Sequence, residues 1–344
     1  MLTVAALRGY VLEEVLARLL YSNGYRLLVS AYEDSDELID GGHGLLVRGR
    51  GANHQADVLG DLAFSVPFSL PIRLFVEAKH WKRRVDLPEV RNAHGVIHDV
   101  NEHYATATAH ARALPVRRHL YQYALFSASG FTKDAQLYAL AQQISLVDLS
   151  GPAFRPLLEA TRRAADELIR IARAAGVQSF SVGQVRAAFR YAFGSSRVAD
   201  YPYRRDVSHG SELDQAFVSV ADGLLDHLYP DLLLGFPAAP FVVVLRPDDP
   251  VRFPAHLRSH GPDIKVTIRF AKQGSVAGDW VIEPADGSGE FRLRFAIPGL
   301  VKNWLVDGDS AMRAWDFKAD MLSSIAVFHD GRLIRLLFEP DRRG

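Results

Sequence analysis

Two stretches near the start of the chain carry side chains that could hold a metal ion and act on water. Gln55-Ala56-Asp57 lies on one apolar stretch, and Glu77-Ala78-Lys79 closes another. Side chains alternate between the faces of a strand, so Gln55 and Asp57 share one face, and Glu77 and Lys79 share one face of the second stretch. If the stretches pair in one sheet, the carboxylates can hold a hard divalent cation, with the lysine beside the water that the metal activates. The pattern predicts a metal-dependent phosphodiesterase.

The Glu-x-Lys triplet is weak on its own, because it arises by chance about once in a chain of this length. Its surroundings make it more specific. Ile72, Leu74 and Val76 form an apolar strand that leads into the triplet, and the turn-forming run 49–53 precedes Asp57. The alternative is a set of exposed charges at strand ends.

The composition is that of an ordinary soluble protein of two or three domains, with 344 residues, 48% of them hydrophobic and 23% charged. There is no cysteine, which excludes disulfides, thiolate zinc sites and cysteine nucleophiles, and fits a cytoplasmic location. Charges interrupt the first helix at helical spacing, so it is not a signal peptide, and no run reaches transmembrane length. The formal net charge is zero, so nucleic-acid binding would need a local basic surface.

The first part of the chain alternates helical and strand patterns. Apolar residues recur at three- and four-residue steps from Leu7 to Leu20, which predicts a helix that ends at Asn23-Gly24. Pro88 after Asp86 indicates a second helix start, and Thr132 a third. Besides the strands that carry the two acids, strands are expected at 26–30, 121–126 and 144–149. This order predicts an α/β sandwich around a mixed sheet.

The pattern changes after the first 150 residues. Helices are expected at 157–175, 181–193 and 213–228, and strands at 241–245, 264–270, 280–283 and 291–297, with a hairpin at 325–338. We therefore divide the chain into an α/β domain (1–152), a helical middle region (153–234) and a β-rich C-terminal domain (235–344). In the last domain Lys265, Thr267 and Arg269 alternate with core residues, which predicts a cationic sheet face. Such a face is more often merely exposed to solvent.

Five separated segments of the first 150 residues resemble PD-(D/E)xK nucleases, specifically the Mrr-like restriction endonuclease branch. In chain order they are Leu12-Glu13-Glu14-Val15 with its Asn23-Gly24-Tyr25 turn, Asp57, Glu77-Ala78-Lys79, the run 125–135 with its Gly130-Phe131-Thr132 step, and the closing strand 144–148. The resemblance implies a restriction-endonuclease-like fold and nuclease activity for this domain. The chain departs from the branch at His54-Gln55-Ala56, where glycines are usual, and in extra sequence between Asp99 and Leu120.

A role for each main site residue follows. Asp57 and Glu77 would bind Mg²⁺, or Mn²⁺ as a substitute, assisted by the carbonyl of Ala78. Lys79, with a lowered pKa, would position or deprotonate the attacking water and offset charge on the phosphate. Glu13 would complete the site from the first helix, which the resemblance favours over its neighbour Glu14. A solvated helix face is the alternative for both glutamates.

Supporting roles are expected of further polar residues. Gln55 would hydrogen-bond the metal ligands, unless it is an ordinary strand residue. Phosphate contacts are expected from Lys82, Arg83, Arg84, Ser127, Ser129, Thr132 and Lys133, although charge runs are often only solvated. His94, His98 and Glu102 lie at steps of four and could bind zinc on a helix, but no Glu follows His94 as in a zinc protease.

We therefore expect a Mg²⁺-dependent DNA endonuclease, in restriction or anti-phage defence, with a defence-system protein as a further partner. A repair or junction nuclease would use the same chemistry. Paired cuts in duplex DNA need two active sites, so a homodimer is expected on function. The rivals are a non-catalytic nucleic-acid-binding or regulatory protein on a nuclease scaffold, and a glycoside hydrolase using Asp57 and Glu77. Lys79 disfavours the hydrolase, because a general acid needs a raised pKa.

Overall fold

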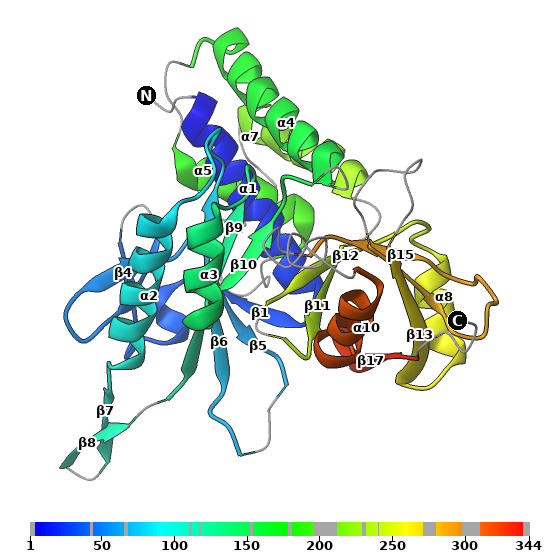
Figure 1. Cartoon of the computed structure of the whole chain (residues 1–344). Coiled ribbons are helices and arrows are strands. Elements are labelled where there is room, and N and C mark those ends of the chain that lie inside the picture. Colours follow the sequence, from blue (N-terminus) through cyan, green and yellow to red (C-terminus); the bar gives the residue numbers. More distant parts are fainter. Residues whose placement is uncertain are drawn as a thin grey trace.

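The computed structural model describes residues 4–41, 44–64, 68–109, 112–116, 118–151, 154–177, 181–195, 212–228, 232–239, 241–270, 280–297 and 310–339. Its N-terminal part is built on a five-stranded sheet in the order β1-β5-β6-β9-β10 (Figure 1). These strands are β1 (Tyr25–Leu28), β5 (Val58–Leu62), β6 (Ile72–Lys79), β9 (Leu120–Ser127) and β10 (Ser145–Asp148). β1, β5 and β6 pair antiparallel, whereas β6, β9 and β10 are parallel, so the sheet is mixed as predicted.

Helices cover both faces of this sheet. On one face α1 (Val4–Ser22) places Leu12 and Leu16 in the same core as Val76 of β6. On the other face α2 (Leu87–Asn101) and α3 (Lys133–Ala141) share a core with Phe75. Successive residues of β6 point to opposite faces, so Phe75 and Val76 serve different cores. The predicted α/β arrangement is confirmed.

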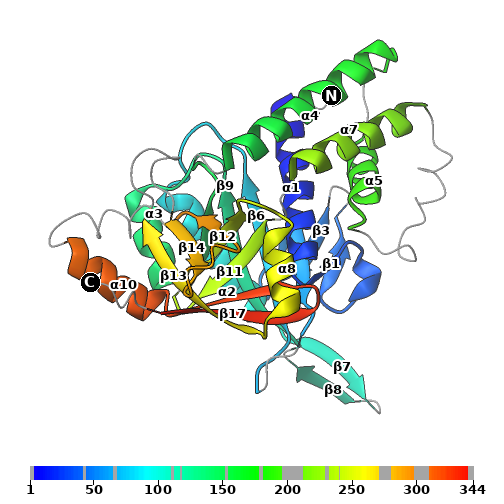
Figure 2. The ribbon, with the colours of Figure 1, turned by 90° about the vertical axis from the view of Figure 1, so that its right-hand side faces the viewer.

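Two insertions extend the sheet domain. The first contains a short 3₁₀ turn, η1 (Ala31–Glu33), and a three-stranded sheet of β2 (Leu38–Asp40), β3 (Leu45–Arg48) and β4 (Asn53–Gln55). The second is the extra sequence before β9, which forms a hairpin of β7 (Ala105–Ala109) and β8 (Arg112–Val116). The hairpin projects from the body of the domain (Figures 1 and 2). Because β9 is parallel to β6 and pairs Leu120 with Ile72, the hairpin leaves the sheet at the end opposite Glu77 and Lys79.

The middle region is helical, as predicted. It consists of α4 (Arg155–Ala174), α5 (Val182–Phe193) and α7 (Glu212–Leu228). These helices share a core with α1, which contributes Leu7, Val11 and Val15. α1 is therefore enclosed between the sheet and the middle helices, and this explains why most of its residues from Val11 onward are buried. Among the described helices, none is both long and apolar enough to cross a bilayer.

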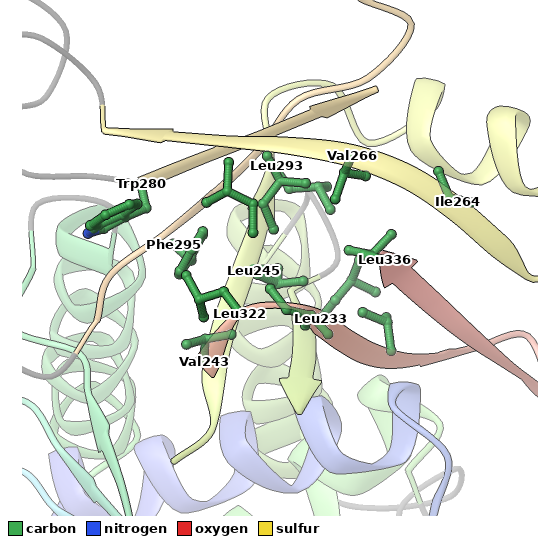
Figure 3. Close-up of a cluster of buried hydrophobic side chains, with 14 of the residues drawn as sticks. Leu233, Val243, Leu245, Ile264, Val266, Trp280, Leu293, Phe295, Leu322 and Leu336 are labelled. Atoms are coloured by element: carbon green, nitrogen blue, oxygen red, sulfur yellow. The ribbon is translucent and has the colours of Figure 1, made fainter. Parts of the chain in front are cut away.

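The C-terminal part is a closed barrel in the order β11-β12-β15-β14-β13-β17-β16. Its strands are β11 (Leu233–Pro237), β12 (Val243–Pro247), β13 (Asp263–Phe270), β14 (Trp280–Pro284), β15 (Leu293–Phe295), β16 (Ser324–His329) and β17 (Arg332–Phe338). Figure 3 shows apolar side chains of this barrel, among them Leu233, Val266 and Leu336, meeting in one buried cluster. The predicted hairpin is confirmed, with Asp330 and Gly331 both at positive φ. Two helices, α8 (Arg252–Ser259) and α10 (Ser310–Met321), were not predicted.

Asn23 and Gly24 end α1, as predicted, and join it to the barrel. The Asn23 side chain donates to the carbonyl of Leu232 at 3.0 Å and accepts from the N–H of Leu234 at 2.6 Å. Gly24 has a φ of +80°, and a Cβ there would lie 1.9 Å from the ring of Phe328 in β16. Both the backbone conformation and the close approach require glycine.

The predicted cationic face of the barrel is balanced by acids. Lys265 donates to Glu339 at 3.0 Å, and Arg292 donates to Glu283 at 2.7 Å. Arg269 also binds Glu283. These exposed pairs fit the simpler alternative, a solvated surface.

Candidate active site

Asp57 lies at the bend between β4 and β5, beside the end of β6. Its backbone N–H donates to the carbonyl of Val76 at 3.1 Å, and its carboxylate accepts from the N–H of Ala78 at 2.8 Å. β5 pairs with β6 from Val58 opposite Val76, which continues the pairing up to the acid. The predicted pairing of the two stretches in one sheet is therefore correct, and it brings Asp57 to the Glu77-Ala78-Lys79 triplet.

Gln55 does not share a strand with Asp57, so the expected alternation between them is wrong. β4 ends at Gln55 and belongs to the three-stranded sheet, whereas β5 begins at Val58 in the main sheet. Gln55 is exposed, and a Cβ on Gly44 would lie 3.1 Å from its amide nitrogen and 3.3 Å from a guanidinium nitrogen of Arg186. Gln55 therefore lies near Arg186, which binds Glu13. A contact between Gln55 and the metal ligands stays a prediction.

Glu77 and Lys79 form an ion pair at the end of β6. The hydroxyl of Tyr123, on the adjacent strand β9, donates to the other oxygen of Glu77. Glu89 of α2 lies 3.5 Å from the Lys79 ammonium, which also sits 4.7 Å from the ring centre of Trp81. Glu77 and Lys79 are each about one fifth or less exposed, so this cluster is partly shielded from water.

Glu13 and Glu14 are buried, which rules out the solvated helix face for both. Glu13 is 7% exposed and pairs with Arg186 of α5. Glu14 is 1% exposed and accepts from Arg190 at 2.9 Å. The choice of Glu13 over Glu14 stays a prediction.

Burial and mutual repulsion raise the pKa values of two of these acids. Burial raises the pKa of Glu13 to about 7, the charge of Asp57 adds to the rise, and Arg186 opposes it. Burial likewise raises the pKa of Asp57 to about 6; the N–H of Ala78 opposes this shift, and the charge of Glu77 adds to it. Carboxylates in this state favour either a proton or another cation.

The pKa of Lys79 differs from the prediction. Burial by itself would lower the pKa of Lys79, but its ion pair with Glu77 and the charge of Glu89 raise it above the ordinary value. The predicted lowered pKa is therefore wrong. Lys79 is a cation here, which suits it to orient water and offset phosphate charge rather than to take up a proton.

The donor set fits a hard divalent cation in its chemistry. Asp57 and Glu77 offer carboxylate oxygens at one strand end, and their mutual repulsion is what a bound cation would relieve. Glu13 would have to exchange its bond to Arg186 for the metal. A ligand role for the Ala78 carbonyl stays a prediction.

Among the described residues, two groups of three potential ligands have their ligand atoms within 4.8 Å of one another, and neither group includes Asp57, Glu77 or Glu13. Asp34, Glu37 and His119 form one group, in which both acids already bind a guanidinium, that of Arg73. The other group, in the barrel, joins His256, His260 and Glu290. The zinc set considered on α2 is in neither group: its first histidine, His94, lies 2.9 Å from the hydroxyl of Tyr138.

The expected phosphate contacts lie on two adjoining loops. A bridge between Val85 and Phe131 joins the run 82–84 to the turn before α3. Exposed side chains on this surface are Lys82, Arg83, Arg84 and Lys133, and half-buried ones are Ser129 and Thr132. The N–H of Ala135 donates to Thr132 at 3.4 Å, so Thr132 caps α3 as predicted.

Ser127 does not fit the expected phosphate contact. It is 0% exposed, and its hydroxyl donates to the carbonyl of Gly130 at 3.0 Å. It stabilises the turn from inside. Arg83 is also engaged, since it lies 3.0 Å from Asp86 and stacks 4.3 Å above the ring centre of Trp81. Because Asp86 binds Arg83, it does not cap α2 with its side chain.

Sequence reasoning missed Tyr123 and Arg186. Tyr123 lies in an apolar strand, where its hydroxyl was the only signal for a polar partner. Arg186 lies between Val185 and Phe189 in the apolar stripe of α5. A charged residue at a core position of an amphipathic helix requires a buried partner, and that signal was in the sequence.

Comparison with known protein families indicates the class of protein to which this site is similar. Residues 4–153 match the Mrr_cat family model, whose description is "Restriction endonuclease". The match covers the N-terminal part of the chain, and the resemblance to the Mrr-like restriction endonuclease family inferred from the sequence is confirmed. This family implies a nuclease that acts on phosphodiester bonds with the help of a metal ion, and DNA as the substrate.

Other comparisons add little. No match is found among curated proteins. A crystal structure titled as that of a protein of unknown function, AF1548, is similar at 15% sequence identity. The match covers 54% of this chain and 99% of that one, with a TM-score of 0.28, which carries no argument about fold or function.

Proposed function

We propose that the protein is a Mg²⁺-dependent DNA endonuclease of restriction or anti-phage defence, built on a restriction-endonuclease-like sandwich. The observation that carries the proposal is the position of Asp57, whose carboxylate binds the N–H of Ala78 between Glu77 and Lys79. Two acids and a lysine thus meet at one strand end, within the segment that matches the family.

The metal would be held by the carboxylates of Asp57 and Glu77, with Glu13 as a third ligand. A bound Mg²⁺ or Mn²⁺ supplies a Lewis acid for the phosphate and lowers the pKa of a bound water. The protein's own part is to fix the acids. Tyr123 orients Glu77 through its hydroxyl, and the Ala78 N–H orients Asp57.

Lys79 would stabilise charge on the phosphate that is cleaved. Its raised pKa keeps the ammonium protonated, and its partial burial strengthens its attraction for an anion. Flanking phosphates would bind Lys82, Arg84, Ser129, Thr132 and Lys133, with the N-terminus of α3 behind the last two.

We propose that the chain is divided into a nuclease domain at 1–152, a helical region at 153–234 and a β-rich domain at 235–344. The last domain would contact a partner protein or select the target. A homodimer and a cytoplasmic location also stay predictions.

The second candidate is a regulatory protein on a nuclease scaffold. The pairing of Glu13 with Arg186 favours it, because that acid is engaged by the protein itself. The presence of Asp57, Glu77 and Lys79 together favours the nuclease, because a scaffold without catalysis has no need of all three.

The test is cleavage of supercoiled and linear DNA with Mg²⁺, Mn²⁺ or EDTA. We expect metal-dependent cutting that Asp57→Ala and Lys79→Ala both abolish. Lys265→Ala, a lysine on the barrel surface, is the control and should cut like the wild type. Cutting that persists in both site variants would reject the site, and no cutting by the wild type with either metal would favour the regulatory protein.

A further inference from the structure

Two histidines and a glutamate meet on the barrel, away from the candidate active site. His256 lies in the last turn of α8, His260 is the residue that ends this helix, and Glu290 lies between β14 and β15. One ring nitrogen of each histidine and one carboxylate oxygen of Glu290 lie within 4.8 Å of one another. α8 packs on the side of the barrel turned away from the five-stranded sheet (Figures 1 and 2). The group is therefore separate from the acids at the end of β6.

The helix brings the two histidines to one face. Residues four apart on a helix are neighbours, and the rings of His256 and His260 stack with their centres 3.9 Å apart. Nδ1 of His260 lies 3.0 Å from the carbonyl oxygen of His256 and donates to it, because a carbonyl oxygen only accepts. Neutral His260 then presents the lone pair of its Nε2. A bond to a backbone oxygen orients metal-binding histidines in the same way.

Packing against the barrel fixes His256. This residue is 5% exposed, and its ring meets that of Phe291 edge to face, with the ring centres 4.9 Å apart. Phe291 itself belongs to the barrel core. Nδ1 of His256 lies 2.5 Å from a carboxylate oxygen of Glu290. His256 is therefore held in place, and the exposed side chains of His260 and Glu290 converge on it.

The carboxylate of Glu290 is available to a further cation. About half of its side chain is exposed, and in the described part of the chain its one ion-pair partner is His256. The group that contains Asp34 differs in this respect, because the guanidinium of Arg73 already takes the place of a cation there. The barrel group is the better candidate for a metal ion.

The donor set favours zinc. Imidazole nitrogens with one carboxylate oxygen suit a transition metal such as Zn²⁺ better than Mg²⁺ or Ca²⁺, and a chain without cysteine can offer zinc only such ligands. Tetrahedral zinc holds its ligand atoms about 3.4 Å apart, so small movements of His260 and Glu290 are sufficient. The metal would take the place of the proton between His256 and Glu290.

We propose that His256, His260 and Glu290 bind Zn²⁺, with water as the fourth ligand, and that the metal joins α8 to the turn between β14 and β15. The zinc site would stabilise the barrel. It is distinct from the Mg²⁺ site proposed at Asp57 and Glu77, and it does not depend on the proposed nuclease function.

The chain offers a matched control. His94 and His98 are also four residues apart on a helix, but their ring centres are 6.4 Å apart, and they belong to neither ligand group found among the described residues. His98 is exposed, as is His260. Each substitution to alanine removes one exposed imidazole, so neither should disturb folding. Glu290→Gln keeps the shape of the third ligand and removes its charge.

The experiment is calorimetric titration of the full chain with Zn²⁺ in excess Mg²⁺. All proteins carry Asp57→Ala, so that the candidate active site does not account for the zinc bound. We expect one zinc per chain with a Kd of about 1 μM or lower. His260→Ala and Glu290→Gln should each weaken binding by about 10-fold or more, and His98→Ala should stay within about 2-fold. Zn²⁺ should also raise the Tm of the parent protein more than that of Glu290→Gln.

Zinc binding that His260→Ala and Glu290→Gln leave unchanged would overturn the proposal. So would an equal loss of binding in His98→Ala, or binding by the parent protein only at millimolar Zn²⁺. The titration contains no DNA and measures no cleavage. Its outcome is therefore separable from that of the nuclease proposal.

Discussion

β6 carries charged residues at both ends, and the two ends treat their charges differently. At the start of the strand Arg73 is 1% exposed and is surrounded by acids: it bonds to Asp61 at 2.6 Å, and to Asp34 and Glu37 at 2.9 Å each. The hydroxyl of Tyr121 donates to Glu37 at 2.7 Å. Each of these charges has a geometrically good partner, as in a structural network.

At the other end of β6, buried acidic side chains lie close together and repel one another. Asp57 and Glu13 have raised pKa values, because they are buried close to other acids. The bonds from Arg186 and from the Ala78 N–H relieve this only in part. Burial of charge alone therefore does not distinguish a functional site from a structural network. A candidate functional site is indicated by buried acids whose hydrogen-bond and ion-pair partners do not fully offset the cost of ionising them.

The largest expected effect is a loss of stability when the buried charge network around Arg73, at the start of β6, is disrupted. Arg73→Met keeps an unbranched apolar stem but removes the buried guanidinium, so Glu37 loses its arginine, and Asp34 and Asp61 keep one arginine each, Arg118 and Arg26. We expect a loss of about 3–5 kcal/mol of unfolding free energy, measured by urea denaturation. Arg269→Met is the control, because it removes an exposed pair and should cost less than about 1 kcal/mol. An unchanged midpoint for Arg73→Met would show that the network adds nothing to stability.

At the end of β6 that carries the candidate active site, we expect the stability of the protein to depend on pH. The pKa of Asp57 rises from 3.8 to about 6 on folding, so the folded protein binds this proton more tightly than the unfolded chain. Without metal, stability should therefore fall as pH rises from about 4 to 6, and Glu13 should extend the fall to about pH 7. Thermal unfolding in EDTA at several pH values measures this.

Asp57→Asn tests the assignment of that pH dependence. At about pH 8 the variant should be more stable than the wild type by on the order of 1 kcal/mol in EDTA, and the difference should vanish near pH 4. Mg²⁺ should raise the stability of the wild type more than that of the variant. A variant that is less stable at every pH would contradict the account.

The smallest expected effect is on DNA binding, when exposed arginines near the site are replaced. Arg83 has its charge met by Asp86 and Glu89, at 3.0 and 3.7 Å, whereas no ion pair engages Arg84 in the described residues. Arg84→Ala should therefore weaken DNA binding by about 3-fold, and Arg83→Ala by less. Salt-dependent binding curves decide this, and a larger effect of Arg83→Ala would contradict it.

The sequence was sufficient for most of the elements. Amphipathic repeats predicted α1 and the three middle helices, and the Asp330-Gly331 pair predicted the barrel hairpin. The closure of the barrel was not predictable, because it depends on pairing β11 with β16, about ninety residues apart. Such contacts are set by tertiary packing and leave no local signal.

For the site, the sequence identified the acids and the lysine but not their electrostatic state. The spacing of Glu77 and Lys79 gave their common face, whereas the raised pKa of Lys79 depends first on its ion pair with Glu77 and then on Glu89 from α2. The break between β4 and β5 separated Gln55 from Asp57 where simple alternation predicted one strand. Arg186 was missed because its partner lies 173 residues away in the sequence.

We propose that one end of β6 is catalytic and the other structural, and a crossed comparison of two variants tests this proposal. Cleavage rate and thermal stability are measured together for Lys79→Ala and Tyr121→Phe. We predict that Lys79→Ala cuts DNA at least about 100-fold more slowly with near wild-type stability. Tyr121→Phe should lose about 1–2 kcal/mol of stability and cut within about 2-fold of the wild type. Wild-type cutting by Lys79→Ala, or an equal loss of cutting by Tyr121→Phe, would contradict the account.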